Sequence, residues 1–183
     1  MNFIAQIRDD HQTDSIGWIG GCPPEILVET LSTLEDYRFY LTIQKKENPE
    51  KYISIFVHHD FNTRIDHDIF PDIAIQVFEH DVSPESNASA FRLADLRKSD
   101  LSPFQHVHQS KFNFITYADQ PKLIQEESYY FEHLQQDYEF YLQIDEDYYL
   151  DSTLQGSYIF AYGALYLFRH KHSHQIIAGF WQH

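Results

Sequence analysis

The sequence has little of several things that common protein classes need. Cys22 is its only cysteine, which excludes an internal disulfide and a metal cage built from cysteines. No apolar run approaches the length of about 20 residues that a membrane-spanning helix needs. The opening MNFIAQIRDDHQ reaches its charges before any apolar stretch long enough for a signal peptide. We therefore expect a cytoplasmic protein.

Basic residues are also scarce. The chain has 13 Lys and Arg against 28 Asp and Glu, which gives a formal net charge of −15. Such a charge repels the phosphates of nucleic acids and anionic lipids, so we expect neither nucleic acid nor a membrane as a partner. The same charge attracts a basic protein.

What the sequence does contain is typical of a folded domain. Apolar residues make up 43% and aromatic residues 16% of the 183 positions, which is too rich for disorder. A chain of this length can bury one sizeable core. We therefore predict a single domain over residues 1–183.

One phrase occurs twice. DYRFYLTIQ at 36–44 and DYEFYLQID at 137–145 agree at six of their first eight positions. Their aromatic and aliphatic residues favour β-strands, and alternate positions of a strand share one face. The odd-numbered residues of the first copy and the even-numbered residues of the second should each form such a face. The residues that we expect to be buried there are Phe39, Leu41, Phe140 and Leu142.

The similarity continues after each phrase. ISIFVHHD at 53–60 matches LYLFRHKH at 165–172, and IQVFEH at 75–80 matches AGFWQH at 178–183. The same order in both halves predicts an internal repeat over about 36–80 and 137–183, with a variable middle segment. The alternative is that buried strands use few residue types and match by chance.

The predicted fold class is mainly β (α+β), with internally duplicated β units forming one domain and few short helices. Six further segments have the composition of strands: 52–58, 73–79, 111–117, 157–162, 164–169 and 175–181. Helical segments are fewer, at 24–34 and, more briefly, at 91–98, and the segment 123–136 is ambiguous. Loops are expected at 81–90 and 99–104.

Short motifs give the chain a resemblance to the YwqG-like family, a bacterial domain family without an assigned function. The residues that carry it are Gly20-Gly21-Cys22-Pro23, Ile43-Gln44, Leu142-Gln143-Ile144 and Trp181-Gln182. The chain departs from the family at Tyr162-Gly163-Ala164, where members usually have an acid in a Gly-Asp-x-Gly-like turn. The resemblance implies a mainly β, internally duplicated fold and no particular reaction.

Twelve histidines raise the question of a metal site. His170, His172 and His174 have strand spacing, and His58-His59-Asp60 occupies the matching place in the first half. Lys171 and Ser173 instead favour a hairpin turn, in which histidine is only a tolerated polar residue. We therefore predict no metal ligands and no cofactor.

The sequence offers no set of residues for catalysis. Cys22 lies in Gly-Gly-Cys-Pro-Pro, where a tight loop explains the composition, and no base can be assigned to it. The chain has no Gly-x-Ser-x-Gly, no phosphate-binding glycine loop and no His-Glu-x-x-His. Enzymatic activity stays open, but we expect none.

The segment 119–151 combines acids with tyrosines. It contains ten acids and Lys122 as its single base. Tyrosines provide contact area at low entropic cost, while carboxylates attract a basic partner. The alternative is that the tyrosines belong to a buried strand and the acids to an ordinary solvated rim. The predicted partner-binding residues are Glu126, Glu127, Tyr129, Tyr130, Asp145, Glu146, Asp147, Tyr148 and Tyr149.

The sequence therefore predicts a non-enzymatic, acidic protein that binds a basic protein. An immunity protein that neutralises a basic bacterial toxin or effector fits this description best. The alternatives are an enzyme or metal-dependent protein that uses the histidine-bearing strands, and a chaperone-like adaptor for basic proteins.

Overall fold

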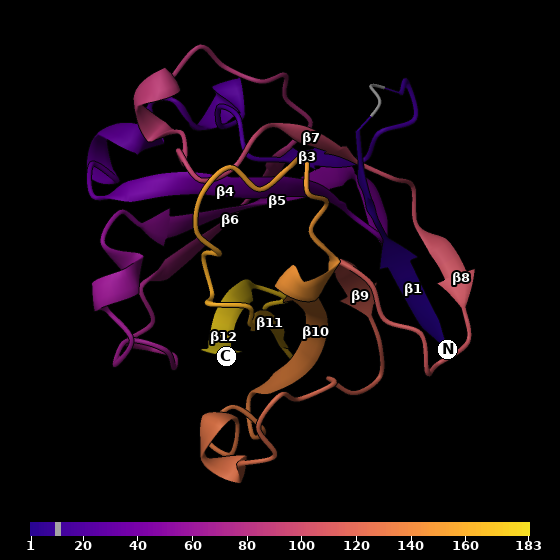
Figure 1. Cartoon of the computed structure of the whole chain (residues 1–183). Helices are drawn as coiled ribbons and strands as arrows, with labels where there is room; N and C mark the ends of the chain where they lie inside the picture. The colour runs from indigo at the N-terminus through magenta and orange to yellow at the C-terminus, as the bar shows by residue number, and fades with distance from the viewer. Residues whose placement is uncertain (10–11) are drawn as a thin grey trace.

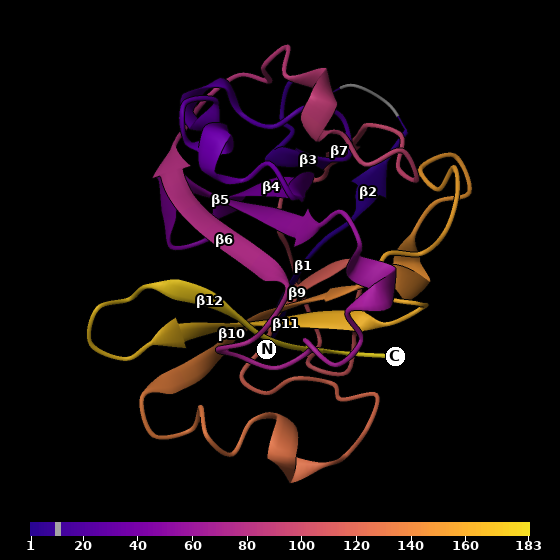
Figure 2. The same ribbon diagram turned by 90° about the vertical axis from the view of Figure 1, so that its left-hand side faces the viewer.

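The computed structural model describes residues 1–9 and 12–183, which form two antiparallel sheets packed against each other (Figure 1). Sheet A has the strand order β12-β11-β10-β9-β1-β8, and sheet B has the order β2-β7-β3-β4-β5-β6. Figure 2 shows sheet B above sheet A, with β6 and β12 on the same side of the molecule. The strands are β1 (Asn2–Ala5), β2 (Ile7–Arg8), β3 (Gly17–Ile19), β4 (Tyr37–Lys45), β5 (Asn48–His58), β6 (Ile75–Asp81), β7 (Ser99–Leu101), β8 (Gln105–Val107), β9 (Ile115–Tyr117), β10 (Tyr138–Asp145), β11 (Ala164–His170) and β12 (Ile176–Gln182).

The prediction of a mainly β fold with few short helices is confirmed. All helical elements among the described residues are short 3₁₀ turns: η1 (Glu25–Leu27), η2 (Thr30–Thr33), η3 (Phe61–Thr63), η4 (Ser89–Phe91), η5 (Ser128–Tyr130) and η6 (Glu146–Tyr148). None of the described helical elements could cross a bilayer, because none is both long and apolar enough.

Several predicted elements are wrong. The segments 24–34 and 91–98 contain at most isolated 3₁₀ turns where we expected helices, and the ambiguous segment 123–136 contains the 3₁₀ turn η5. The segment 157–162 is a loop, and the predicted loop at 99–104 begins with β7. Only the last three residues of 111–117 form a strand.

The two sheets have the same strand order, because each strand of sheet A has a counterpart in sheet B whose number differs by six. Written with these counterparts, the order of sheet A, β12-β11-β10-β9-β1-β8, becomes β6-β5-β4-β3-β7-β2, which is sheet B read in reverse. Each half of the chain therefore contributes one early strand to the other half's sheet, since β1 lies in sheet A and β7 in sheet B. This order supports a repeat wider than 36–80 and 137–183; superposition of the halves stays a prediction.

The repeated phrases form β4 and β10, and both strands contain a bulge at the same place. The register with the neighbouring strand shifts between Phe39 and Leu41 in β4, and between Phe140 and Leu142 in β10. A bulge adds one residue and turns the following side chains to the other face. The expected single face for alternate residues is therefore wrong.

Apolar residues fill three layers. The main core lies between the sheets and includes Leu41 and Leu142. Outside sheet B, the segment with η1 and η2 packs on Phe39. Outside sheet A, residues 118–137 pack on the outer face, the orange segment below the sheets in Figures 1 and 2. Phe39, Leu41 and Leu142 are fully buried as predicted, but Phe140 is only partly buried.

Candidate functional site: a groove beside β10

Phe140 is partly buried because the sheet opens beside it. β9 pairs with β10 only through Gln143↔Thr116 and Ile144↔Ile115. On its other edge, β10 pairs with β11 from Tyr138 onwards. Among the described residues, the first half of β10 therefore has no strand partner toward β9.

Two cavities occupy this opening. One has a volume of about 650 Å³ and the other of about 360 Å³. Both are lined by Ala118, Asp119 and Phe140, so they lie next to each other, and we call the two together the β10 groove. Its outer part is floored by Leu123, Phe131, Tyr138 and Phe168, and its inner part by Phe3, Tyr117 and Tyr141.

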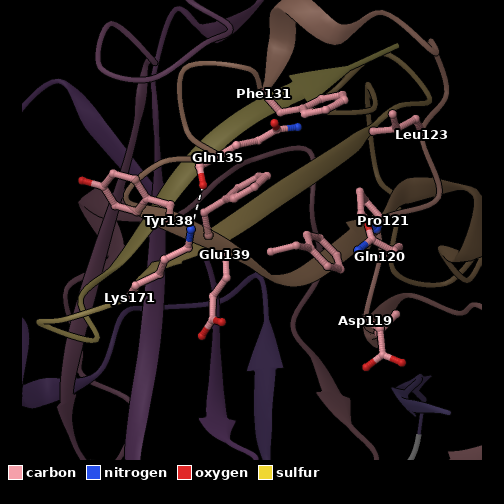
Figure 3. Close-up of a pocket in the computed structure, with 12 residues that line it drawn as sticks. Asp119, Gln120, Pro121, Leu123, Phe131, Gln135, Tyr138, Glu139 and Lys171 are labelled. Carbon is pink, nitrogen blue, oxygen red and sulfur yellow. Dashed lines mark hydrogen bonds between the residues drawn. The ribbon is translucent and has the colours of Figure 1, made fainter.

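The outer part has two facing walls (Figure 3). Gln120 and Pro121 lie on one side, and Tyr138 and Lys171 lie on the opposite side. The Lys171 ammonium donates hydrogen bonds to the backbone carbonyls of Gln135 (2.7 Å) and Gln136 (3.0 Å). This cation therefore fastens the covering segment to the β11–β12 hairpin.

Carboxylates form the rim. Asp119 and Glu139 point to the same side of the outer cavity, away from Phe131. Both residues are exposed. The outer wall between them, residues 119–139, contains six acids and Lys122 as its only Lys or Arg. The outer part therefore joins an aromatic floor to a negative rim.

The charges at the inner part are bound to one another. Arg169 Nε donates to Glu139 Oε1 over 2.9 Å, and Arg169 Nη1 lies 3.5 Å from Glu47 Oε1. The Lys46 ammonium lies 4.5 Å from the centre of the Phe3 ring, at cation–π distance. These contacts connect the β4–β5 hairpin of sheet B to β1 and β11 of sheet A.

Two buried phenols complete the inner part. The Tyr117 hydroxyl donates to the Tyr141 hydroxyl (3.3 Å), which donates to Glu47 Oε1 (3.0 Å). Burial raises the pKa of both tyrosines above their ordinary value, with Glu47 adding to the effect. Both phenols therefore stay neutral and act as hydrogen-bond donors.

Four of the predicted partner-binding residues lie on the segment that covers sheet A. Glu126, Glu127 and Tyr129 are exposed, whereas Tyr130 is buried against Phe180. Glu126 lines a third cavity of about 440 Å³. This cavity shares three lining residues with the β10 groove: Pro121, Leu123 and Phe131. Glu126 therefore lies next to the groove.

Three of the other predicted residues, Asp145, Glu146 and Tyr149, belong to an internal cluster. Glu146 has no exposed surface, and Asp145 is also buried. Glu146 Oε1 accepts hydrogen bonds from the Ile159 N–H (2.8 Å) and the Tyr149 hydroxyl (3.1 Å). Its Oε2 accepts from the Phe160 N–H (2.9 Å). Burial raises the pKa of Glu146 to about 7.

Burial corrects the prediction for three residues, Asp145 and Glu146 in this cluster and Tyr130 in the segment outside sheet A, whose side chains are not available to a partner. Asp147 is exposed, and Tyr148 and Tyr149 are partly buried. The Tyr149 hydroxyl lies 2.8 Å from the Tyr40 hydroxyl, so the cluster joins sheet B to the loop after β10.

Most residues of the groove could not be predicted from the sequence. Asp119 and Glu139 lie within the acidic segment 119–151, so composition carried a signal for the rim. Phe3 and Glu47 come from distant parts of the chain, and no local pattern connects them to Phe140.

The histidines of the first half gather with one acid. Ligand atoms of Asp36, His58 and His59 lie within 4.8 Å of one another. The two rings are nearly parallel, with centroids 4.6 Å apart, so their in-plane lone pairs do not converge on one point. His58 Nδ1 also accepts the Asp60 N–H (3.1 Å), and His59 Nδ1 donates to the Asp36 carbonyl (2.8 Å). We therefore assign no metal to this cluster.

The histidines of the second half lie at a hairpin. His170 ends β11, and its Nδ1 accepts the Ser173 N–H (3.0 Å) within the turn that leads to β12. The interpretation of this segment as a hairpin turn is confirmed.

The β10 groove thus has a shape and a chemistry that suit a ligand. The resemblance to the YwqG-like family stays a prediction. Compared with known proteins, the chain matches no family model, no curated protein and no solved structure.

Proposed function

We propose that this protein binds a basic protein partner in the β10 groove and catalyses no reaction. The observation that carries the proposal is the aromatic floor around Phe140 beside the exposed carboxylates of Asp119 and Glu139. Glu139 shares its charge with Arg169, and Asp119 lies 3.8 Å from the N-terminal ammonium at an exposed position, so a ligand cation would join or replace these contacts. A Lys or Arg side chain has an aliphatic stem and a cationic end. Its stem can pack on rings while its charge reaches a carboxylate.

The charge of the whole molecule favours the same partner. At least five of the 13 Lys and Arg side chains are already paired with carboxylates: Arg8, Lys45, Lys51, Lys98 and Arg169. The remaining acidic excess produces a negative field that speeds the approach of a basic protein. We propose a basic toxin or effector as this partner, and an immunity function as the biological role.

The test is binding to the product of the adjacent gene, because an immunity protein is normally encoded beside its toxin. The two proteins would be purified together, and co-expression should remove any toxicity of the neighbour. In the double variant Asp119→Lys with Glu139→Lys, association should slow several-fold and the neutralisation should weaken.

A matched control carries the same change in charge on the opposite side of the molecule. Glu25→Lys with Glu35→Lys alters two exposed acids of the segment outside sheet B. This variant should bind almost normally. Equal effects of the two double variants, or no effect of either, would contradict the groove as the binding site.

A further inference from the structure

We infer that the β10 groove captures an extended segment of the partner, in which a basic residue between two apolar residues pairs with the free edge of β10. The inference rests on the proposed function and specifies what the groove recognises. The edge of β10 beside Phe140 is open in sheet A, whereas the equivalent edge of β4 beside Phe39 is covered in sheet B.

The equivalent positions follow from the registers. Gly17 pairs with Ile43 in sheet B, and Ile115 pairs with Ile144 in sheet A. Ile43 and Ile144 are the same position of the repeated phrase, so Gly17 corresponds to Ile115. With the same offset, residues 20–23 correspond to 118–121, which form one wall of the groove. Pro23 then corresponds to Pro121.

In sheet B, a segment of the chain itself lies at this place. Arg92 forms an isolated parallel bridge with Phe39, the counterpart of Phe140. Its backbone is extended, with φ −72° and ψ 143°. Phe91 packs in the outer cluster that contains Phe39, whereas Leu93 packs against the core between the sheets. An apolar–basic–apolar segment thus crosses the edge of the sheet from one face to the other.

In sheet A, cavities lie where these apolar side chains would pack. The outer part of the groove, with Phe131 and Phe168, corresponds to the site of Phe91. The inner part, with Phe3 and Tyr117, corresponds to the site of Leu93. Both volumes, about 650 and 360 Å³, fall within the range of about 300–1,000 Å³ that is usual for binding pockets.

The charges differ between the two sheets in a way that favours a basic ligand. Arg38 in β4 corresponds to Glu139 in β10. Asp119 corresponds to Gly21, where the Glu85 carboxylate already lies close by and accepts the Cys22 N–H. A basic residue beside Phe140 would therefore meet Asp119 and Glu139, the latter shared with Arg169. Arg92 beside Phe39 instead has Arg38 as its neighbour in β4. Addition of a strand to an open sheet edge gives affinity through the backbone, and the pockets on either side give specificity.

The chain supplies its own probe. The capped peptide Ala-Ser-Ala-Phe-Arg-Leu-Ala has the sequence of residues 88–94. It would be titrated into the full chain, with calorimetry for affinity and amide NMR shifts for location. The proposal expects saturable binding, with the largest shifts at 118–121 and 139–141.

Two altered peptides separate backbone pairing from charge. Methylation of the backbone nitrogens of Arg and Leu keeps the side chains and removes the pairing, so affinity should fall at least about fivefold. Replacing Arg by Glu should also weaken binding to the natural chain. That Glu peptide should bind Glu139→Lys better than it binds the natural chain, which a general loss of structure in the variant would not produce.

Other outcomes overturn the inference. They are no binding at millimolar peptide, shifts outside the groove, and an affinity that backbone methylation leaves unchanged. Self-association of the chain that the peptide disrupts would identify a second copy as the occupant. A basic partner that is sensitive to Asp119→Lys but does not compete with the peptide would preserve the proposed function and reject only strand pairing.

Discussion

Glu146 is a carboxylate without exposed surface whose hydrogen-bond partners are all donors. The N–H groups of Ile159, Phe160 and Gly163 and the hydroxyl of Tyr149 point to its two oxygens. These bonds partly compensate the loss of water, but desolvation is the stronger effect and raises the pKa. At the residue scale, this group links stability to pH.

Stability should fall as Glu146 ionises. Folding raises its pKa from 4.5 to about 7, which corresponds to roughly 3 kcal/mol at about 1.4 kcal/mol per unit. Because the protonated form is favoured in the fold, its contribution is complete below about pH 4.5 and is lost as pH rises through about 7. Urea unfolding of the natural chain and of Glu146→Gln at several pH values between about 4.5 and 7 measures this contribution.

The diagnostic quantity is the difference in unfolding free energy between the two proteins, because other titrations then cancel. His58 and His80 have lowered pKa values through burial and act in the opposite direction in both proteins. Tyr40 and Tyr149 face the carboxylate and stay neutral, since burial raises their pKa values. Parallel stability curves would show that Glu146 does not titrate in this range.

The two phrases offer a second test at the residue scale. Leu142→Ala should cost about 2–5 kcal/mol of unfolding free energy, because this side chain is fully buried between the sheets. Phe140→Ala should cost less than about 2 kcal/mol, since one side of the ring already borders a cavity. Denaturant unfolding of both variants measures the two losses of unfolding free energy. Equal losses would show that the ring of Phe140 is fully packed in solution.

At the scale of elements, irregularities in the strands place the side chains. The bulges at Tyr40 and Tyr141 move a large aromatic residue into the core between the sheets. The loop 157–163 keeps its shape through Glu146, with positive φ at Ala161 (54°) and Tyr162 (67°). Composition alone made this loop resemble a strand.

The start of β3 requires glycine. Gly17 has φ +150°, and a Cβ there would lie 2.1 Å from the Thr42 carbonyl oxygen of the paired strand. Gly17→Ala should therefore destabilise the protein by at least about 1–3 kcal/mol. In Gly156→Ala the nearest obstacle is the Asp95 side chain, which can rotate, so thermal melts should show a smaller loss. The reverse order would contradict the contact at Gly17.

At the scale of the whole molecule, the fold consists of two sheets and three apolar layers. We expect protein purified without added metal to contain no stoichiometric zinc or copper. EDTA should leave the melting temperature unchanged, because no described cluster directs several lone pairs to one point. A melting temperature that falls with chelation and recovers with zinc, but not in His58→Ala with His59→Ala, would contradict this.

The sequence by itself determined the mainly β class and the strands of the repeated phrases. These properties depend on local composition, since Phe, Tyr, Leu and Ile at alternate positions favour a strand whatever lies around it. It also determined the negative charge. The strands β1, β2, β3 and β7 have two to four residues each, too few for a period to be read.

Only the tertiary structure decided which acids face solvent and where a ligand can bind. Glu146 and Asp147 are neighbours in an acidic run, yet one is fully buried and the other exposed. The groove needs Phe3, Glu47, Asp119 and Phe140 together, and their separation in sequence hides the connection. A cavity is the space that several elements fail to fill, and that space exists only once the sheets have packed.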